Sequence, residues 1–223
     1  MRPRFFQFVA PALWAFGAMA ALLNCSSGAE NTRALTQAAE LNEPGTTQLE
    51  GRVSSLHIKL PANEKDRGLC KPGVPSASLK KDGFVGDYNK YRCTRLNNTP
   101  DRAVSLITRD ALDYLHENGW PMVTEGDLGL NIIVDGITYS QLVAAQHFKL
   151  GSNVEIELTE QAAPCKVLKR LIDEKYFPQE TEAFRAEKFA AFINILANRR
   201  GWYAKVITEG SVNAGDATVY IRK

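Results

Sequence analysis

Cys165, directly after Pro164, is the side chain in this sequence best suited to chemistry. A cysteine thiolate is a nucleophile and a soft ligand for metal ions. Strand-like alternation ends before Cys165 and helical spacing begins after it, so we expect it at the end of a strand. The alternative is a small buried hydrophobic residue, because free cysteines are often buried. We take Cys165 as the best candidate for a functional, catalytic thiolate.

The other cysteines are Cys25, Cys70 and Cys93. If Cys25 is set aside, an odd number remains, so at least one thiol is unpaired unless it bonds between chains. Cys70 and Cys93 could pair in an oxidising compartment. No Cys-x-x-Cys or Cys/His spacing suggests zinc, so we do not expect a metal ion held by several protein ligands.

Short strands account for most of the elements that must position Cys165. Each strand is a run of apolar residues, either alternating with polar ones or continuous. Residues typical of turns stand at both ends of each run. The expected strands cover residues 51–60, 103–107, 131–134, the hairpin 148–158, 202–207 and 217–221. Glycines and prolines punctuate residues 62–90, which are expected to form a long loop.

Helices are expected at fewer places. Residues 109–118 follow Thr108 as N-cap and end at Gly119. Apolar residues at helical spacing continue in residues 167–172 and 184–198. Many short strands with few helices predict a mainly β fold with α, namely a closed β-barrel flanked by a few helices.

The first 25 residues have the layout of a secretory signal. Arg2 and Arg4 precede residues 5–23, which carry no charge. The sequence Leu22-Leu23-Asn24-Cys25 resembles a bacterial lipobox, in which Cys25 would be lipidated, although its asparagine replaces the usual small residue. The alternatives are a cleaved soluble form and an uncleaved membrane anchor. The segment therefore predicts an exported protein that is periplasmic or extracellular, or attached to a membrane through a lipid or an apolar segment. The alternative is a membrane anchor with the domain on the cytoplasmic side.

Residues 26–49 are rich in Ala, Thr, Asn, Gln and Glu and are predicted to be a flexible tether, followed by one domain over residues 50–223. Lys and Arg number 27 against 25 Asp and Glu, which leaves a net charge of +2. No overall field therefore favours nucleic acid as a partner. Any anion site must be local.

Six short motifs occur in order along residues 50–221, and each alone is common. They are Gly83-Phe-Val-Gly-Asp87, Asp101-Arg-Ala-Val104, Gly126-Asp-Leu-Gly-Leu-Asn131, Thr159 to Pro164-Cys165, Gly201-Trp-Tyr-Ala-Lys-Val206 and Gly215-Asp216. Together they resemble the MOSC domain, the module similar to the C-terminal part of molybdenum cofactor sulfurases. The resemblance implies a β-barrel that binds molybdenum cofactor (molybdopterin).

In such a domain the cysteine of the Pro-Cys motif is a metal ligand or a sulfur carrier, and that residue corresponds to Cys165. Related reductases remove oxygen from small N-hydroxylated substrates, with electrons from a redox partner. The resemblance therefore implies an oxidoreductase for small N-oxygenated compounds. The alternatives are a cofactor-binding or persulfide-carrying module without reduction chemistry, and a barrel with a structural role only.

Arg102 and Asn131 are the further candidate cofactor-binding residues. The planar guanidinium of Arg102 could bind the pterin phosphate, and its alternative is a surface salt bridge. Asn131 corresponds to the family's Asn after the Gly-Asp-x-Gly run, where its amide could bind the pterin. The alternative for Asn131 is capping of a turn, and Asp87 is expected to fix the turn after Gly86.

Cations follow Cys165 and also end the second helical segment. They are Lys166, Lys169, Arg170, Arg199 and Arg200. Such residues could stabilise a thiolate or neutralise the phosphate of a cofactor, and the alternative is a solvated helix face.

The sequence departs from the family at two places. Leu130 stands where members commonly have Glu, and residues 96–101 replace a His-Gly-Gly element. A carboxylate and an imidazole are therefore missing from the expected cleft. No histidine is expected to transfer protons to the substrate there.

Overall fold

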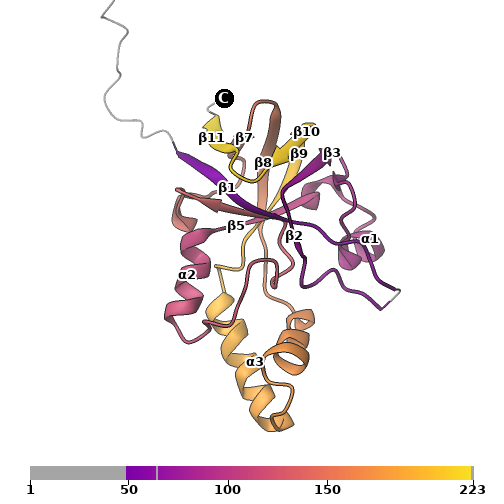
Figure 1. Ribbon diagram of the computed structural model, residues 1–223, viewed down its shortest axis with the longest axis vertical. Coiled ribbons are helices and arrows are strands. Elements are labelled where there is room, and N and C mark those ends of the chain that lie inside the picture. The colour runs from indigo at the N-terminus through magenta and orange to yellow at the C-terminus, as the bar shows by residue number, and fades with distance from the viewer. Residues whose placement is uncertain (1–48, 64, 222–223) are drawn as a thin grey trace, which may run out of the picture. The chain divides into compact units, whose positions relative to one another are not determined.

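The computed structural model describes residues 49–63 and 65–221, which all belong to one compact unit. Seven strands close into a barrel in the order β11, β7, β8, β9, β5, β6, β1, and β11 pairs again with β1. Figure 1 shows the labelled strands at one end of this unit and α3 at the other. These strands are β1 (Glu50–His57), β5 (Val104–Thr108), β6 (Ile132–Asp135), β7 (His147–Leu150), β8 (Val154–Gln161), β9 (Trp202–Thr208) and β11 (Ala217–Ile221). The predicted fold class, a closed β-barrel with a few helices, is confirmed.

The barrel encloses the apolar core. In β8, Val154, Ile156 and Leu158 are fully buried, whereas Glu155 and Glu157 between them are half-buried on the other face. This period of two is what one buried face of a strand requires. The turn at residues 151–153 joins β7 to β8, as the sequence predicts.

The predicted loop over residues 62–90 is wrong in part, because short strands interrupt it. β2 (Gly73–Val74) pairs with β1, while β3 (Ser76–Lys80) and β4 (Gly83–Phe84) form a small sheet with β10 (Gly210–Asn213). β10 lies between the predicted strands at residues 202–207 and 217–221, where the sequence predicts no strand. Most of these strands are too short to show an alternation of apolar and polar residues. β3 pairs with β10, which is more than a hundred residues away in the sequence.

One helix packs against the barrel where the sequence predicts it. α2 (Arg109–Glu117) begins after the N-cap Thr108, and Gly119 just beyond it has a φ of 90°. α2 links β5 to its parallel neighbour β6. A shorter helix, α1 (Lys90–Arg95), follows the N-cap Asn89 and was not predicted.

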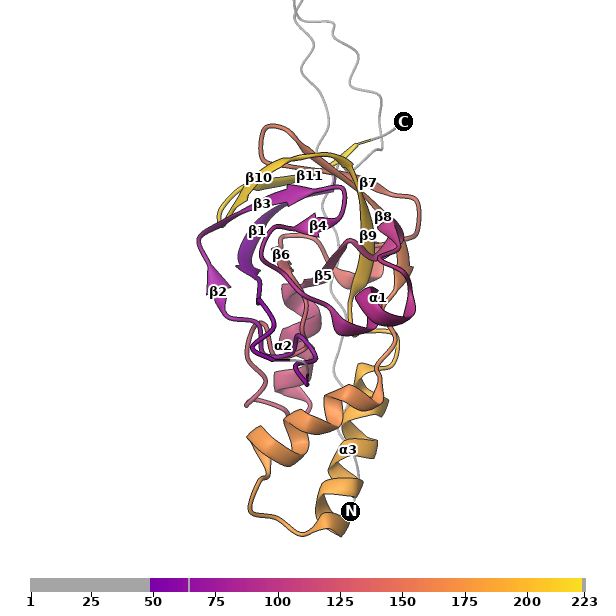
Figure 2. The same cartoon turned by 90° about the vertical axis from the view of Figure 1, so that its right-hand side faces the viewer.

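A helical hairpin fills the chain between β8 and β9 and extends away from the strands (Figure 2). It contains the 3-10 turn η3 (Lys166–Leu168), the π-helical turn η4 (Leu171–Tyr176) and α3 (Glu182–Leu196). Phe192 of α3 lies 4.5 Å from Trp120 between ring centroids, which joins the hairpin to the barrel core. Two further 3-10 turns, η1 (Pro100–Arg102) and η2 (Tyr139–Gln141), complete the elements.

Residues 1–48 lie outside the described part of the chain, so the predictions for Cys25, the apolar segment and the tether concern residues whose structure is not described. Within residues 49–63 and 65–221, no helix is long and apolar enough to span a bilayer.

Candidate functional site

A cavity of about 360 Å³ opens at the end of the barrel from which the helical hairpin leaves. Its walls come from residues 67–69, α1, the end of β8, the Pro-Cys segment and the start of β9. Cys165, Arg102, Lys166, Arg200 and Tyr203 all line it. The structure therefore brings two of the predicted site residues, Cys165 and Arg102, into one wall.

Cys165 is an exposed free thiol at this cavity. β8 has ended at Gln161, and Cys165 is extended, with φ −138° and ψ 166°, immediately before η3. Its carbonyl accepts a hydrogen bond from the Leu168 N–H at 3.1 Å, which fixes the start of that turn. The alternative in which Cys165 is a buried hydrophobic residue is therefore wrong.

Arg102 lines the cavity and also forms the salt bridge that was its alternative. Its Nε and Nη2 donate to the two carboxylate oxygens of Glu160 at 2.5 and 3.0 Å, and its guanidinium lies 4.8 Å from the centre of the Tyr203 ring. A bidentate pair of this kind holds both side chains in one orientation. Arg102 thus has its charge compensated by Glu160 before any ligand binds.

Arg200 is a buried cation without a counter-ion among the described residues. Its side chain is only 7% exposed, and Nη2 donates to the Leu128 carbonyl at 2.8 Å. Nε and Nη1 are buried without a hydrogen-bond partner, and within the described part of the chain Arg200 forms no ion pair. A buried cation in this condition is costly unless an anion compensates it.

The neighbouring Arg199 has a different environment. Its guanidinium lies 4.1 Å from the centre of the Tyr114 ring and does not line the cavity. From the sequence alone, Arg199 and Arg200 are equally good candidates for binding an anion. Their burial in the folded protein distinguishes them. Gly201 helps to place Arg200, because its φ is 132° and a Cβ atom at this position would lie only 2.6 Å from the Leu106 carbonyl oxygen, so both features exclude a side chain there.

The three cations that follow Cys165 also differ in whether they form an ion pair. Lys169 pairs with Asp173 at 2.7 Å and Arg170 with Glu174 at 2.8 Å, each one helical turn away. Lys166 forms no ion pair among the described residues and is exposed at the cavity wall. Of the three, Lys166 is therefore the cation available beside the thiol.

Asn131 does not line this cavity. Its Oδ1 accepts hydrogen bonds from the N–H and hydroxyl of Ser105, and its Nδ2 donates to the His57 carbonyl and to Asp87. All four hydrogen bonds that its amide readily makes are formed inside the protein. The structure gives Asn131 a positioning role between β1, β5 and the segment around Asp87.

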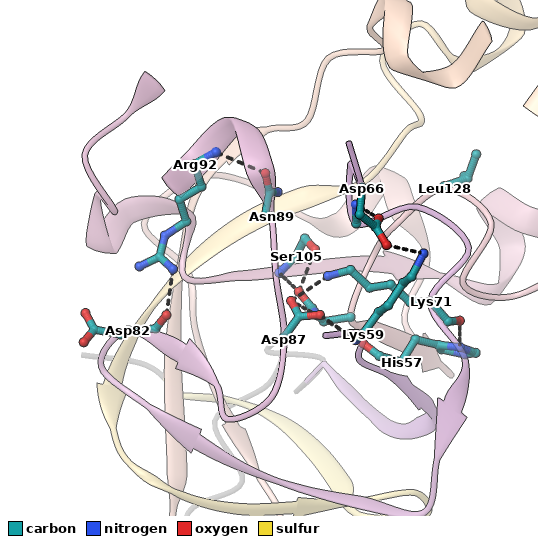
Figure 3. Close-up of polar contacts among 12 residues, drawn as sticks. His57, Lys59, Asp66, Lys71, Asp82, Asp87, Asn89, Arg92, Ser105 and Leu128 are labelled. Atoms are coloured by element: carbon teal, nitrogen blue, oxygen red, sulfur yellow. Dashed lines mark hydrogen bonds and ion pairs between the residues drawn. The ribbon is translucent and has the colours of Figure 1, made fainter. Parts of the chain in front are cut away.

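Lys71 and Asp87 form a buried ion pair that the sequence did not reveal. Lys71 Nζ lies 2.6 Å from Asp87 Oδ2, and the Lys71 side chain is only 2% exposed (Figure 3). Burial lowers the pKa of Lys71, and the charge of Asp87 opposes that effect. Asp87 also accepts from the Lys59 N–H at 3.0 Å and from Asn131 at 2.9 Å. It therefore does more than fix a turn.

Asp66 holds the loop that forms one wall of the cavity. Its carboxylate accepts from the N–H groups of Gly68 and Ala62 and pairs with Lys59 at 3.0 Å (Figure 3). Burial opposes ionisation of Asp66, but these partners outweigh it and lower the pKa of Asp66 to about 2. The wall residues 67–69 are thus fixed by a carboxylate that stays ionised.

Cys70 and Cys93 are both free, so the disulfide left open by the sequence is not formed. Burial raises the pKa of the Cys70 thiol, and the nearby Asp127 carboxylate adds to the effect. Within the described residues no group of three or more His, Cys, Asp or Glu side chains is placed to hold a metal ion.

A closed seven-stranded barrel with an exposed Pro-Cys thiol at one end defines the class of this protein. The chain belongs to the MOSC domain family, because the family model matches residues 93–219. No curated protein matches the chain in sequence.

Solved structures share the fold. The YuaD protein from Bacillus subtilis superposes with a TM-score of 0.62 at 17% identity, over 79% of this chain and 98% of that one. YiiM from Geobacillus stearothermophilus gives 0.55 at 17% identity, over 77% and 75% of the two chains. YiiM from Escherichia coli gives 0.50 at 19% identity, over 77% and 70%. At these identities the likeness shows the fold.

Proposed function

We propose that this protein binds molybdenum cofactor (molybdopterin) in the cavity at Cys165 and reduces small N-oxygenated compounds. The observation that carries the proposal is the pairing, in one cavity, of an exposed thiol with the uncompensated cation Arg200. MOSC domains are associated with this cofactor in general, which agrees with the pairing.

The residues present fit such a group. A phosphorylated pterin brings negative charge, and Arg200 has two guanidinium nitrogens without partners in the described structure. The thiolate of Cys165 is a soft ligand suited to molybdenum. Arg102, held by Glu160 and Tyr203, forms a rigid side of the same cavity. Asn131 does not contact the group and instead links Ser105, His57 and Asp87 through its hydrogen bonds.

The proposed reaction needs two electrons and two protons, which convert an N–OH group into N–H and release water. When bound, the cofactor supplies the two-electron chemistry. A separate redox partner delivers the electrons. No histidine lines the cavity among the described residues, so protons come from solvent at its exposed mouth or from the ammonium of Lys166.

The exposure of Cys165 also favours a second candidate function. A thiol that is open to solvent and beside the unpaired Lys166 can carry a persulfide to an acceptor. In that case the protein would be a sulfur carrier without reduction chemistry of its own. A persulfide-specific label on Cys165, in protein that contains no molybdenum, would support this function over the first.

We also propose that the protein acts outside the cytoplasm and is attached to a membrane. The support is the uncharged stretch of residues 5–23 after two arginines, and the lipobox-like position of Cys25. Lipidation of Cys25 and cleavage before it would be visible in the mass of the mature chain.

Arg200 provides the test of cofactor binding. We expect Arg200→Met to reduce the affinity for the pterin about 10- to 100-fold, because a hydrogen bond to a charged group contributes about 1.5–3 kcal/mol. The measurement is pterin fluorescence per chain after purification from a host that makes the cofactor. Arg199→Met is the matched control and should retain the pterin, because Arg199 packs on Tyr114. Equal pterin content in the two variants would contradict the proposal.

A further inference from the structure

Beside the cofactor cavity lies a second hollow, of about 560 Å³, between α1 and the start of the helical hairpin. We call it the basic groove. Five cations and one aromatic residue line it, namely Arg67, Lys90, Arg95, Lys166, Arg170 and Tyr91. None of the described residues that line it is acidic. A hollow of this size is within the usual range for small ligands.

The charge of the groove is a local feature. The whole chain carries a net charge of only +2, so a general excess of basic residues does not explain five cations around one hollow. Arg170 is offset by Glu174 at 2.8 Å. Arg67, Arg95 and Lys166 form no ion pair among residues 49–63 and 65–221. Like charges kept close together attract an anion.

The groove wall formed by α1 is fixed in advance. Arg92 is buried, and its guanidinium donates to the carbonyls of Asp82, Asn98 and Thr99 at 2.7, 3.0 and 2.8 Å. Figure 3 shows the bond to Asp82. These bonds tie the short helix to the loops on both sides. Tyr91 and Arg95 are therefore presented by a braced element, which lowers the ordering cost of binding.

Tyr91 adds an aromatic surface to the charge. Its side chain is 57% exposed and borders both the basic groove and the cofactor cavity. Large exposed aromatic rings are good platforms for planar ligands, and base stacking on such a ring is worth about 1–3 kcal/mol. Arg67 and Lys166 also border both hollows. A ligand in the groove can thus reach the mouth at Cys165.

We propose that the basic groove binds a nucleoside phosphate, with the phosphate on Arg67, Arg95 and Lys166 and the base on Tyr91. The phosphate of the cofactor is compensated by Arg200 in the other cavity, which leaves these three cations for a second ligand. The inference goes beyond the proposed function and does not depend on it. Binding in the groove itself needs no cofactor.

The test is calorimetric titration of the full-length, cofactor-free protein with adenosine 5′-monophosphate, adenosine and inorganic phosphate. We expect the monophosphate to bind at least tenfold more tightly than either of the other two. Arg67→Gln/Arg95→Gln should weaken the monophosphate at least tenfold, and Tyr91→Ala should weaken it about tenfold while leaving inorganic phosphate unchanged. Lys149→Gln, an exposed cation on β7 away from the groove, is the control and should bind as the wild type does.

Three results would overturn the inference: no binding of the monophosphate, equal affinity for adenosine, or binding that the groove variants leave unchanged. Thermal unfolding of each variant shows whether a loss comes from misfolding. Because the titration uses cofactor-free protein, binding that persists when the wild type never acquires molybdenum would refute the proposed function and leave the groove ligand intact.

Discussion

Replacing Cys165 by serine should lower the reduction of an N-hydroxylated substrate by cofactor-loaded protein at least a hundredfold. Cys165 is the exposed thiol in the cavity that also contains the uncompensated Arg200. A serine hydroxyl is un-ionised at neutral pH and is a hard ligand, so it cannot replace a thiolate at molybdenum. The oxidation of a reduced viologen dye, coupled to formation of the amine, measures the turnover.

Two other cysteines serve as controls for this variant. Cys70→Ser and Cys93→Ser should retain turnover within about twofold, because neither thiol lines the cavity at Cys165. Turnover by Cys165→Ser at the wild-type rate would show that the thiol is not needed. A uniform loss in all three variants would indicate damage to the fold, which a thermal unfolding curve would reveal.

Removing the carboxylate of Asp87 should lower the free energy of unfolding by about 3–5 kcal/mol, the cost of leaving one partner of a buried ion pair alone. Lys71 is 3% exposed and has Asp87 at 2.6 Å as its counter-ion. Asp87→Ala would also remove the acceptor for Asn131 and for the Lys59 N–H. Urea denaturation measures the change.

Lys71→Met tests the same ion pair by removing its cation. The methionine is apolar and similar in length, so the double variant Asp87→Ala/Lys71→Met should be more stable than Asp87→Ala alone. Asp82→Ala is the control, because Asp82 is exposed and contacts Arg92 only through its carbonyl. Equal stability of Asp87→Ala and Asp82→Ala would show that the buried pair contributes nothing.

The sequence predicts those parts of the fold that have a local signature. β8 alternates over residues 154–158, and α2 has a recognisable N-cap position at Thr108 and a glycine after its end. β3 and β10 have no such signature, because each short strand is defined by its distant partner. Local patterns cannot report a pairing that only the closed fold creates.

The residues of the candidate site could likewise be predicted only where the sequence carries a local signal. Cys165 follows from its chemistry and its motif, and Arg102 lies in the same cavity. Burial, which the sequence does not give, separates Arg200 from Arg199 and takes Lys71 out of solvent. Lysine is seldom fully buried, so the residue type alone does not indicate the burial of Lys71. The hydrogen bonds of Asn131 likewise depend on three segments that meet only in the folded chain.

Molybdenum content tests the central claim most directly. The wild-type chain, purified from a host that makes molybdenum cofactor, is analysed by elemental mass spectrometry together with pterin fluorescence. Binding at Cys165 and Arg200 predicts close to one molybdenum and one pterin per chain. Wild-type protein that contains neither, from every such preparation, would contradict the claim and favour the sulfur carrier or a structural role for the barrel.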